Sequence, residues 1–330
     1  MEEGTGRWGI IGHEWAVRLL ARSLAQGQLA HAYLLIGPPR IGKTALALAL
    51  AQAVNCRAAR PPCGACRSCQ LIAEGKHPDV RLITGGEVRA IHIDTVRDLQ
   101  RELALSPLEG KRRVAILTDF QGATPEAANS LLKTLEEPPG QALLVLTASQ
   151  RSRLLPTIVS RCQPLPLRPP SQKTIYEGLL ARGVPAADAE TLSHMAGGRV
   201  GWALQAAGEP ALLEERARHL AALQDVLQAD TLGRLRWARE LCGDEDTLPA
   251  LLDSWQNVWR DLLLWETGCR EWVANVDQQQ ALAAMAQGRS VGQLVAGLQE
   301  LAAARRRLDA NVNPRLTLEV LFLRLGEVQP

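Results

Sequence analysis

The chain has 330 residues, of which 46% are hydrophobic, and a formal net charge of +2. This length leaves room for two or three domains, and so small a net charge provides no bulk field that would attract nucleic acid. No apolar run approaches the roughly 18 residues of a membrane-spanning helix and no stretch resembles a signal peptide, so we expect a soluble, cytosolic protein.

The first informative segment is a glycine-rich loop between a strand pattern and a helix pattern. Residues 14–26 form an amphipathic helical pattern, and the apolar run 32–36 is typical of a buried parallel strand. Residues 37–44, GPPRIGKT, match the P-loop pattern G-x-x-x-x-G-K-[ST]. The alanine- and leucine-rich segment 44–54 then predicts a helix. A plain turn is the alternative, but the flanking elements favour a P-loop.

A P-loop in this setting binds the phosphates of a nucleotide. Its backbone N–H groups, framed by Gly37 and Gly42, point at a phosphate chain at the start of a helix. Lys43 would reach the β- and γ-phosphates, and the Thr44 hydroxyl would hold Mg²⁺. We therefore expect the chain to be able to bind ATP with Mg²⁺.

Four cysteines follow the P-loop helix with the spacing C-x6-C-x2-C-x2-C: Cys56, Cys63, Cys66 and Cys69. Short CxxC pairs of thiolates suit tetrahedral zinc, and four thiolates leave no open position, so the metal would be structural. A redox CxxC pair and a set of buried free thiols are the alternatives. We call residues 56–69 the knuckle. The other three cysteines, Cys162, Cys242 and Cys269, are expected to be small core residues.

Beyond the knuckle, strand and helix patterns alternate. Strands are predicted at residues 79–83, 113–117 and 143–147, and helices at residues 93–105 and 125–136. Proline follows Thr124 at the start of the second helix, which is the usual order of a capped helix start. The alternation predicts an α/β fold with a doubly wound parallel sheet, whose ligand binds at the carboxyl ends of the strands.

After Leu167-Arg-Pro-Pro170 the pattern is helical. Residues 171–207 predict a small three-helix segment, and residues from about 210 to 330 predict further helices. The tryptophans at 255, 259 and 265 could stack on bases, but core packing is the favoured use of such large rings. We therefore predict a nucleotide-binding domain over 1–168, a small helical domain over 169–207 and an all-α domain over 208–330.

Several motifs resemble the bacterial clamp-loader AAA+ family. Residues 127–139, AANSLLKTLEEPP, and Ser160-Arg161-Cys162 resemble its AAA+ subunits in general. Residues 11–14 (IGHE), 77–79 (HPD) and 311–319 (NVNPRLTLE) are most similar to the δ′ subunits of DNA polymerase III. The resemblance covers nearly the whole chain. It implies an AAA+ module, a helical lid and a C-terminal collar that oligomerises.

The resemblance also implies partners and nucleotide-side residues. The partners would be the γ/τ motor subunits and δ in a hetero-oligomer, acting on the sliding clamp and primer–template DNA. In the motors an Asp-Glu pair ends the second apolar strand, whereas here Thr118 and Asp119, or Asp119 and Phe120, occupy those places. Asp119 and Ser149 remain as candidate nucleotide-side residues. The lid arginine of the motors is replaced by Gly201, and the x6 spacer of the knuckle is shorter than is usual in the family.

These departures favour a δ′-like stator that binds ATP weakly or without hydrolysis, so that its own enzyme activity is weak or absent. In the family the SRC arginine, here Arg161, reaches across a subunit boundary to the γ-phosphate held by a neighbour; a surface arginine that caps a helix is its alternative role. Two other functions stay open. One is a γ/τ-type ATPase motor, and the other is an autonomous zinc-containing P-loop enzyme.

Overall fold

The computed structural model describes residues 8–85, 90–209, 211–243, 247–310 and 312–327. The chain divides into two compact units, residues 1–178 with 198–201, and residues 179–197 with 202–330. The division into three domains stays a prediction. Pro210, at the expected start of the C-terminal helices, and Asn311, the first residue of the C-terminal motif, lie outside the described residues.

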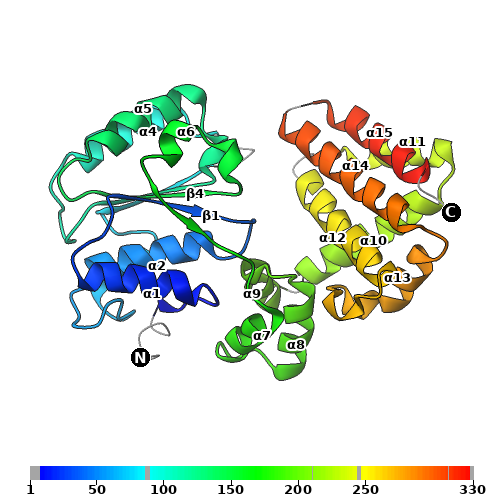
Figure 1. Cartoon of the computed structure of the whole chain (residues 1–330), viewed down its shortest axis with the longest axis horizontal. Coiled ribbons are helices and arrows are strands. Elements are labelled where there is room, and N and C mark those ends of the chain that lie inside the picture. Colours follow the sequence, from blue (N-terminus) through cyan, green and yellow to red (C-terminus); the bar gives the residue numbers. More distant parts are fainter. Residues whose placement is uncertain (1–7, 86–89, 210, 244–246, 311, 328–330) are drawn as a thin grey trace. The chain divides into compact units, whose positions relative to one another are not determined.

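The first unit is built on a five-stranded parallel sheet. Its strands are β1 (Ala32–Ile36), β2 (Val80–Thr84), β3 (Val114–Thr118), β4 (Leu143–Ala148) and β5 (Gln163–Pro166). They lie in the order β2-β3-β4-β1-β5, and each neighbouring pair is parallel. The predicted parallel doubly wound sheet is therefore confirmed (Figure 1).

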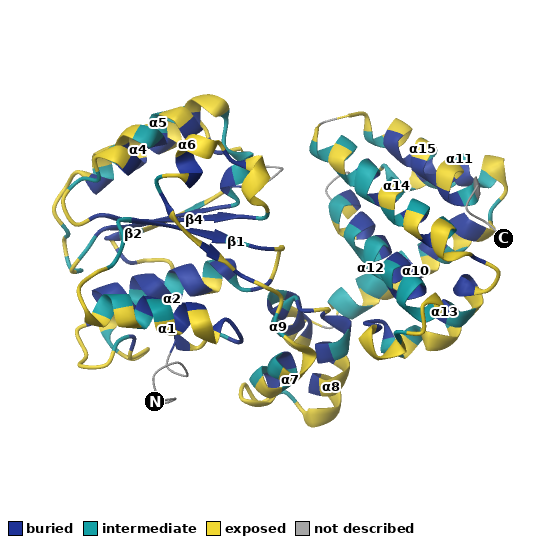
Figure 2. Ribbon diagram, viewed as in Figure 1, coloured by how far each residue is buried: buried dark blue, intermediate teal, exposed yellow. Residues whose placement is uncertain are grey.

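Helices cover both faces of this sheet because its central strands β3, β4 and β1 are apolar on both sides. Tyr33 and Leu35 share one core with α1 (Glu14–Ala25) and α2 (Lys43–Asn55), while Leu34 belongs to a second core on the opposite face. The second core is closed by the other three helices of the sheet, α4 (Ile93–Leu103), α5 (Pro125–Glu136) and α6 (Pro156–Val159). Successive side chains of a strand point to opposite faces, which produces this alternation. Figure 2 shows the buried central strands between the two helical layers.

The structure differs from the predicted elements at a few ends. Strands β2 and β3 each begin one residue later than expected, because Asp79 and Arg113 bind a loop instead of continuing the strand. The short α3 (Arg67–Ala73) lies inside the knuckle segment and was not predicted. Strand β5 was not predicted either, since four residues that include two prolines carry no strand pattern; proline is tolerated there because β5 is an edge strand.

The remaining helices lie in the two segments where the sequence predicts helices. The segment expected as a lid holds α7 (Gln172–Leu180), α8 (Ala186–Met195) and α9 (Val200–Gly208). The C-terminal helices are α10 (Ala211–Gln228), α11 (Thr231–Leu241), α12 (Leu248–Glu266), α13 (Gln279–Ala286), α14 (Val291–Asp309) and α15 (Pro314–Glu327). None of the described helices combines the length and the apolar character needed to cross a membrane.

Two of the three tryptophans in the predicted stripe form the centre of the C-terminal core. Trp255 and Trp259 are fully buried, and the Trp255 ring lies 5.4 Å from that of Phe322. The Trp255 indole N–H donates to the His219 carbonyl. Trp265 is only partly buried at the edge of the same core. Core packing, as predicted for the stripe, is the role these rings have.

Candidate functional site

The P-loop connects β1 to α2, as the sequence predicts, and Lys43 folds back into it. Gly42 precedes the helix with φ 105°, a conformation that favours glycine. The Lys43 side chain is only 6% exposed, and its Nζ donates to the carbonyls of Gly37 (2.7 Å) and Pro38 (2.8 Å). Burial lowers the Lys43 pKa, an effect that the nearby Asp119 carboxylate partly opposes. The ammonium group is thus held inside the loop by main-chain carbonyls.

Two residues that are distant in sequence fix the rest of the loop. The His13 Nε2 lies 2.8 Å from the Ile41 carbonyl, and the Gly201 N–H donates to the Arg40 carbonyl at 2.7 Å. A Cβ at Gly201 would lie 3.1 Å from the same Arg40 oxygen, so the start of α9 approaches the loop this closely because it has glycine there. Nothing in the local sequence pattern signals either contact.

The other residues predicted to face the nucleotide lie, like the P-loop, at the carboxyl ends of the parallel strands. Asp119 directly follows β3, has φ 46°, and donates its N–H to the Thr147 hydroxyl at 2.9 Å. Ser149 directly follows β4, and its N–H donates to the Gln121 side-chain oxygen at 3.2 Å. Gln121 was not predicted, and it joins the two strand ends. Because all strands are parallel, these residues and the P-loop lie at one edge.

Thr118, the last residue of β3, differs from its neighbours in its polar environment. It is 4% exposed, and its hydroxyl has no hydrogen-bond partner among the residues that the structure describes. A hydroxyl is a neutral, weaker ligand for Mg²⁺ than a carboxylate is. The end of β3 therefore carries a hydroxyl residue, Thr118, followed by an acid, Asp119, in the place where the motor subunits are expected to have two consecutive acids.

Arg161 lies near the amino ends of the parallel strands, whereas this chain's own P-loop lies at their carboxyl ends. It follows α6 and comes two residues before β5, whereas the P-loop follows the carboxyl end of the adjacent parallel β1. Its guanidinium makes an ion pair with Glu136 at 2.5 Å and donates to the Thr157 carbonyl at 3.1 Å. The side chain keeps 34% of its surface exposed. Glu136 belongs to the LEEPP motif, but its contact with Arg161 was not predicted.

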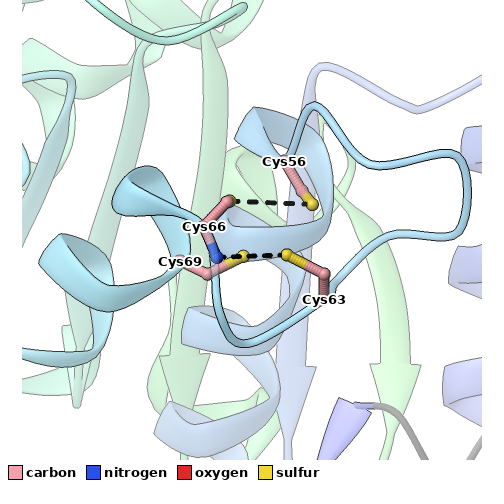
Figure 3. Close-up of side chains that lie close together, drawn as sticks. All are labelled: Cys56, Cys63, Cys66 and Cys69. Atoms are coloured by element: carbon pink, nitrogen blue, oxygen red, sulfur yellow. Dashed lines mark hydrogen bonds between the residues drawn. The ribbon is translucent and has the colours of Figure 1, made fainter.

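The four knuckle cysteines converge on one point, as Figure 3 shows. All four sulfur atoms lie within 4.8 Å of one another, and the Sγ atoms of Cys66 and Cys56 are 3.9 Å apart. Tetrahedral zinc with Zn–S bonds of about 2.3 Å requires sulfur–sulfur distances of about 3.8 Å. Cys56 directly follows α2, Cys66 precedes α3, and Cys69 lies in its first turn. Two helix ends thus bring the ligands together.

The surroundings of the sulfurs suit thiolates that share a cation. Backbone N–H groups point at Cys56 (from Ala58, 3.4 Å) and at Cys63 (from Cys66, 3.3 Å). The N–H of Cys66 is the largest of the effects that lower the Cys63 pKa to about 6, whereas burial raises the pKa of Cys69 to about 12. A cation is needed to hold the buried members as thiolates, so the cluster fits a metal ion. Of the other cysteines Cys162 is buried, as predicted, but Cys242 and Cys269 are only partly buried.

Comparison with known proteins decides the family. A family model described as DNA polymerase III, delta subunit, matches residues 12–171, and one described as its C terminal part matches residues 210–327. The DNA polymerase III subunit delta′ of Bacillus subtilis is 32% identical over 324 residues, covering 94% of this chain and 95% of that protein. The chain belongs to the family of DNA polymerase III delta′ subunits.

Two further relatives place this delta′-family chain among the polymerase III subunits. The delta′ subunit of Pseudomonas aeruginosa is 42% identical over 188 residues, 56% of each chain. The tau subunit of Escherichia coli is 34% identical over 155 residues, which cover 46% of this chain and 24% of that protein. The resemblance stated from the motifs is therefore confirmed, and so are the expected parallel sheet covered by helices, the four-cysteine cluster and the helical C-terminal part.

Proposed function

We propose that the chain is the δ′ component of a clamp loader, which assembles with γ/τ-type motors and a δ subunit to load a sliding clamp onto primer–template DNA during replication. The observation that carries this proposal is membership of the delta′ family over 94% of the chain. Co-expression with the motor and δ subunits of the same organism, followed by sizing, tests it. We expect one hetero-oligomer; a chain that stays monomeric beside assembled motors would refute the proposal.

Within the assembly the chain acts as a stator that holds nucleotide without rapid hydrolysis. The P-loop with Lys43 supports binding of ATP and Mg²⁺ through Gly37, Gly42 and Thr44. Hydrolysis needs a metal-binding acid and a group that orients the attacking water. At the end of β3 the buried Thr118 and then Asp119 stand where a motor is expected to have two acids. This difference supports weak or absent ATP hydrolysis by the chain itself.

Lys43→Ala should weaken ATP binding by roughly ten- to a hundredfold, because charge-assisted hydrogen bonds to phosphate are among the stronger polar contacts. Titration with a fluorescent ATP analogue measures the effect. Lys76→Ala, which removes the same charge from an exposed site that pairs with Glu74, is the matched control and should bind normally. Equal affinity of the Lys43 variant and the wild type would mean that the P-loop does not hold nucleotide.

Arg161 supplies positive charge to the nucleotide of a neighbouring motor. Arg161 lies near the amino ends of the parallel strands, whereas its own P-loop lies at the carboxyl end of the adjacent β1. This position supports a role at a neighbour's nucleotide, not at its own. The guanidinium is partly exposed and pairs with Glu136 of its own chain, so it can reach a neighbour that docks there. An arginine aimed at a transferring phosphoryl group stabilises charge in the transition state.

The four cysteines hold one structural Zn²⁺. The mutual distances of their sulfurs and the N–H groups that point at them support this assignment. When bound, zinc supplies a cross-link between the end of α2 and the start of α3, and four thiolates leave it no position for substrate.

The last helix carries an apolar stripe that supports collar assembly. Leu316, Val320 and Leu323 are 58%, 44% and 36% exposed, and their i, i+4, i+7 spacing places them on one face of α15. Such a face suits the collar helices of neighbouring subunits.

Val320→Asp should therefore weaken assembly by roughly ten- to a hundredfold, because it buries a charge without a partner in the interface. The monomer should stay folded, since the site is exposed in it. Analytical ultracentrifugation of the mixed subunits measures the loss. Gln280→Asp adds the same charge to an exposed site on α13 and should leave assembly intact. Normal assembly of the Val320 variant would exclude this stripe from the interface.

A further inference from the structure

A loop next to the knuckle displays two leucines to solvent. Residues 104–113, which we call the leucine loop, connect α4 to β3. Leu105 is 62% exposed and Leu108 is 74% exposed. Single exposed apolar residues are common on protein surfaces and by themselves indicate nothing. These two differ because the backbone that carries them is held by buried polar groups.

A buried carboxylate holds the second half of the leucine loop. Asp79 is 2% exposed and accepts the N–H groups of three consecutive residues, Leu108 (2.7 Å), Glu109 (2.8 Å) and Gly110 (2.7 Å). Burial raises the Asp79 pKa, but these hydrogen bonds outweigh that effect and leave it below its usual value. The carboxylate is therefore ionised and binds the loop through charge-assisted hydrogen bonds.

A buried arginine holds the first half. Arg113 donates to the carbonyls of Leu105 (2.9 Å) and Ser106 (3.0 Å), and it lies 3.8 Å from Asp79. Both leucines are thus anchored through their own main chain, with their side chains left outside. Gly110 is required for this fold of the loop, since a Cβ there would lie 2.6 Å from the Asn55 side-chain oxygen.

The knuckle also holds the loop. Lys111 Nζ donates to the Cys56 carbonyl at 2.6 Å, and Arg57 donates to the Glu109 carbonyl at 2.9 Å. Arg67, in the first turn of α3, pairs with the Glu109 carboxylate at 3.3 Å. The knuckle segment therefore helps to position the leucine loop. A structural metal bound by the knuckle would stabilise the loop as well as the knuckle itself.

The charge around the leucines is basic. Arg57 and Lys111 donate to carbonyl oxygens here, and within the described part of the chain neither forms an ion pair with a carboxylate. Glu109, the acid between them, is neutralised by Arg67. A partner that covers this surface gains most when it places carboxylates around an apolar pocket.

We propose that the leucine loop and the knuckle form a docking surface for a protein that offers an apolar pocket with an acidic rim, and that Leu105 and Leu108 are its anchors. Rigid apolar anchors bind well because little conformational entropy is lost on docking. The partner is a protein of the same assembly, so this inference rests on the proposed function to that extent.

The surface includes the knuckle but is separate from Arg161 and from the P-loop. The leucine loop precedes β3 and Arg161 precedes β5, and these two strands are separated by β4 and β1 in the sheet. The P-loop lies at the opposite, carboxyl edge. One chain can therefore engage a neighbour through Arg161 and a second protein through the leucine loop.

The double variant Leu105→Ser/Leu108→Ser tests the proposal in the reconstituted complex. The probes are the purified motor subunit, δ subunit and sliding clamp, whose affinities for the full-length chain are measured by biolayer interferometry. We expect at least a tenfold loss of affinity for one of them, with zinc content and melting temperature unchanged. Leu180→Ser, at an exposed leucine of α7, should change none of the affinities.

A second experiment tests whether contacts between the knuckle and the leucine loop hold the loop in place. Arg57→Ala/Lys111→Ala should speed amide hydrogen exchange in residues 104–113 and weaken the same affinity, although both leucines remain. If the wild type assembles but the double leucine variant binds all three proteins with full affinity, the docking surface is refuted. If the wild type does not assemble at all, it is the proposed function that fails.

Discussion

Arg161→Ala should remove nearly all DNA- and clamp-stimulated ATP hydrolysis at the motor site that this subunit faces, a loss on the order of a thousandfold at that site. The physical reason is that the motor's own P-loop lysine and Mg²⁺ would be left to neutralise, without the arginine, the charge that builds on the transferring phosphoryl group. The variant should fold and assemble normally, because the side chain is partly exposed and contributes to neither apolar core of its unit. Steady-state ATPase assays of the reconstituted complex measure the effect.

Two substitutions separate the charge from the ion pair. Glu136→Gln removes the same ion pair but leaves the arginine in place, so stimulated hydrolysis should persist. Arg161→Lys keeps the charge without the planar fork of donors and should rescue poorly. Unchanged stimulated turnover in a fully assembled Arg161→Ala complex would remove this residue from the mechanism.

Purified without chelators, the protein should contain one tightly held zinc per chain, and Cys66→Ser should lose most of it. Metal binding and local folding are coupled, with apparent binding free energies of about 10–16 kcal/mol in zinc-finger peptides. The knuckle should therefore lose its hydrogen-exchange protection, while the distant C-terminal helices keep theirs. Because protons compete with the metal for thiolates, zinc release should increase as the pH falls. Elemental analysis and hydrogen exchange measure these effects.

Cys269→Ser is the matched control, since it makes the same substitution at a partly buried cysteine outside the cluster. That variant should retain its zinc. Protein that contains no metal, or a Cys66 variant that contains as much as the wild type, would contradict the assignment.

The sequence is sufficient for the parts of the fold and the site that are local in the chain. The P-loop, its strand and its helix are consecutive, so the place of Lys43 at the start of the helix follows from the local pattern alone. The knuckle cysteines lie within one short segment, and the structure brings their sulfurs together as their spacing predicts. Periodic apolar patterns likewise locate four of the five strands.

The features that the sequence does not predict depend on contacts between distant residues. His13 reaches the P-loop across 28 positions, and Asp79 accepts hydrogen bonds from residues about 30 positions away. No local pattern encodes such pairings, because one polar residue can find a partner anywhere that the fold brings near it. Strand β5 was not predicted for a related reason. Its position is determined by pairing with β1, not by its own short, proline-containing sequence.

We propose that this chain stimulates ATP hydrolysis by its neighbours while turning over little ATP itself. The most direct measurement is steady-state ATPase with the isolated chain, with motor and δ subunits alone, and with all of them together, each in the presence of clamp and primed DNA. We predict negligible turnover by the isolated chain and a large increase when it joins the other subunits. Motor-like turnover by the isolated chain, or no increase on its addition to an assembled complex, would show that it is not a stator.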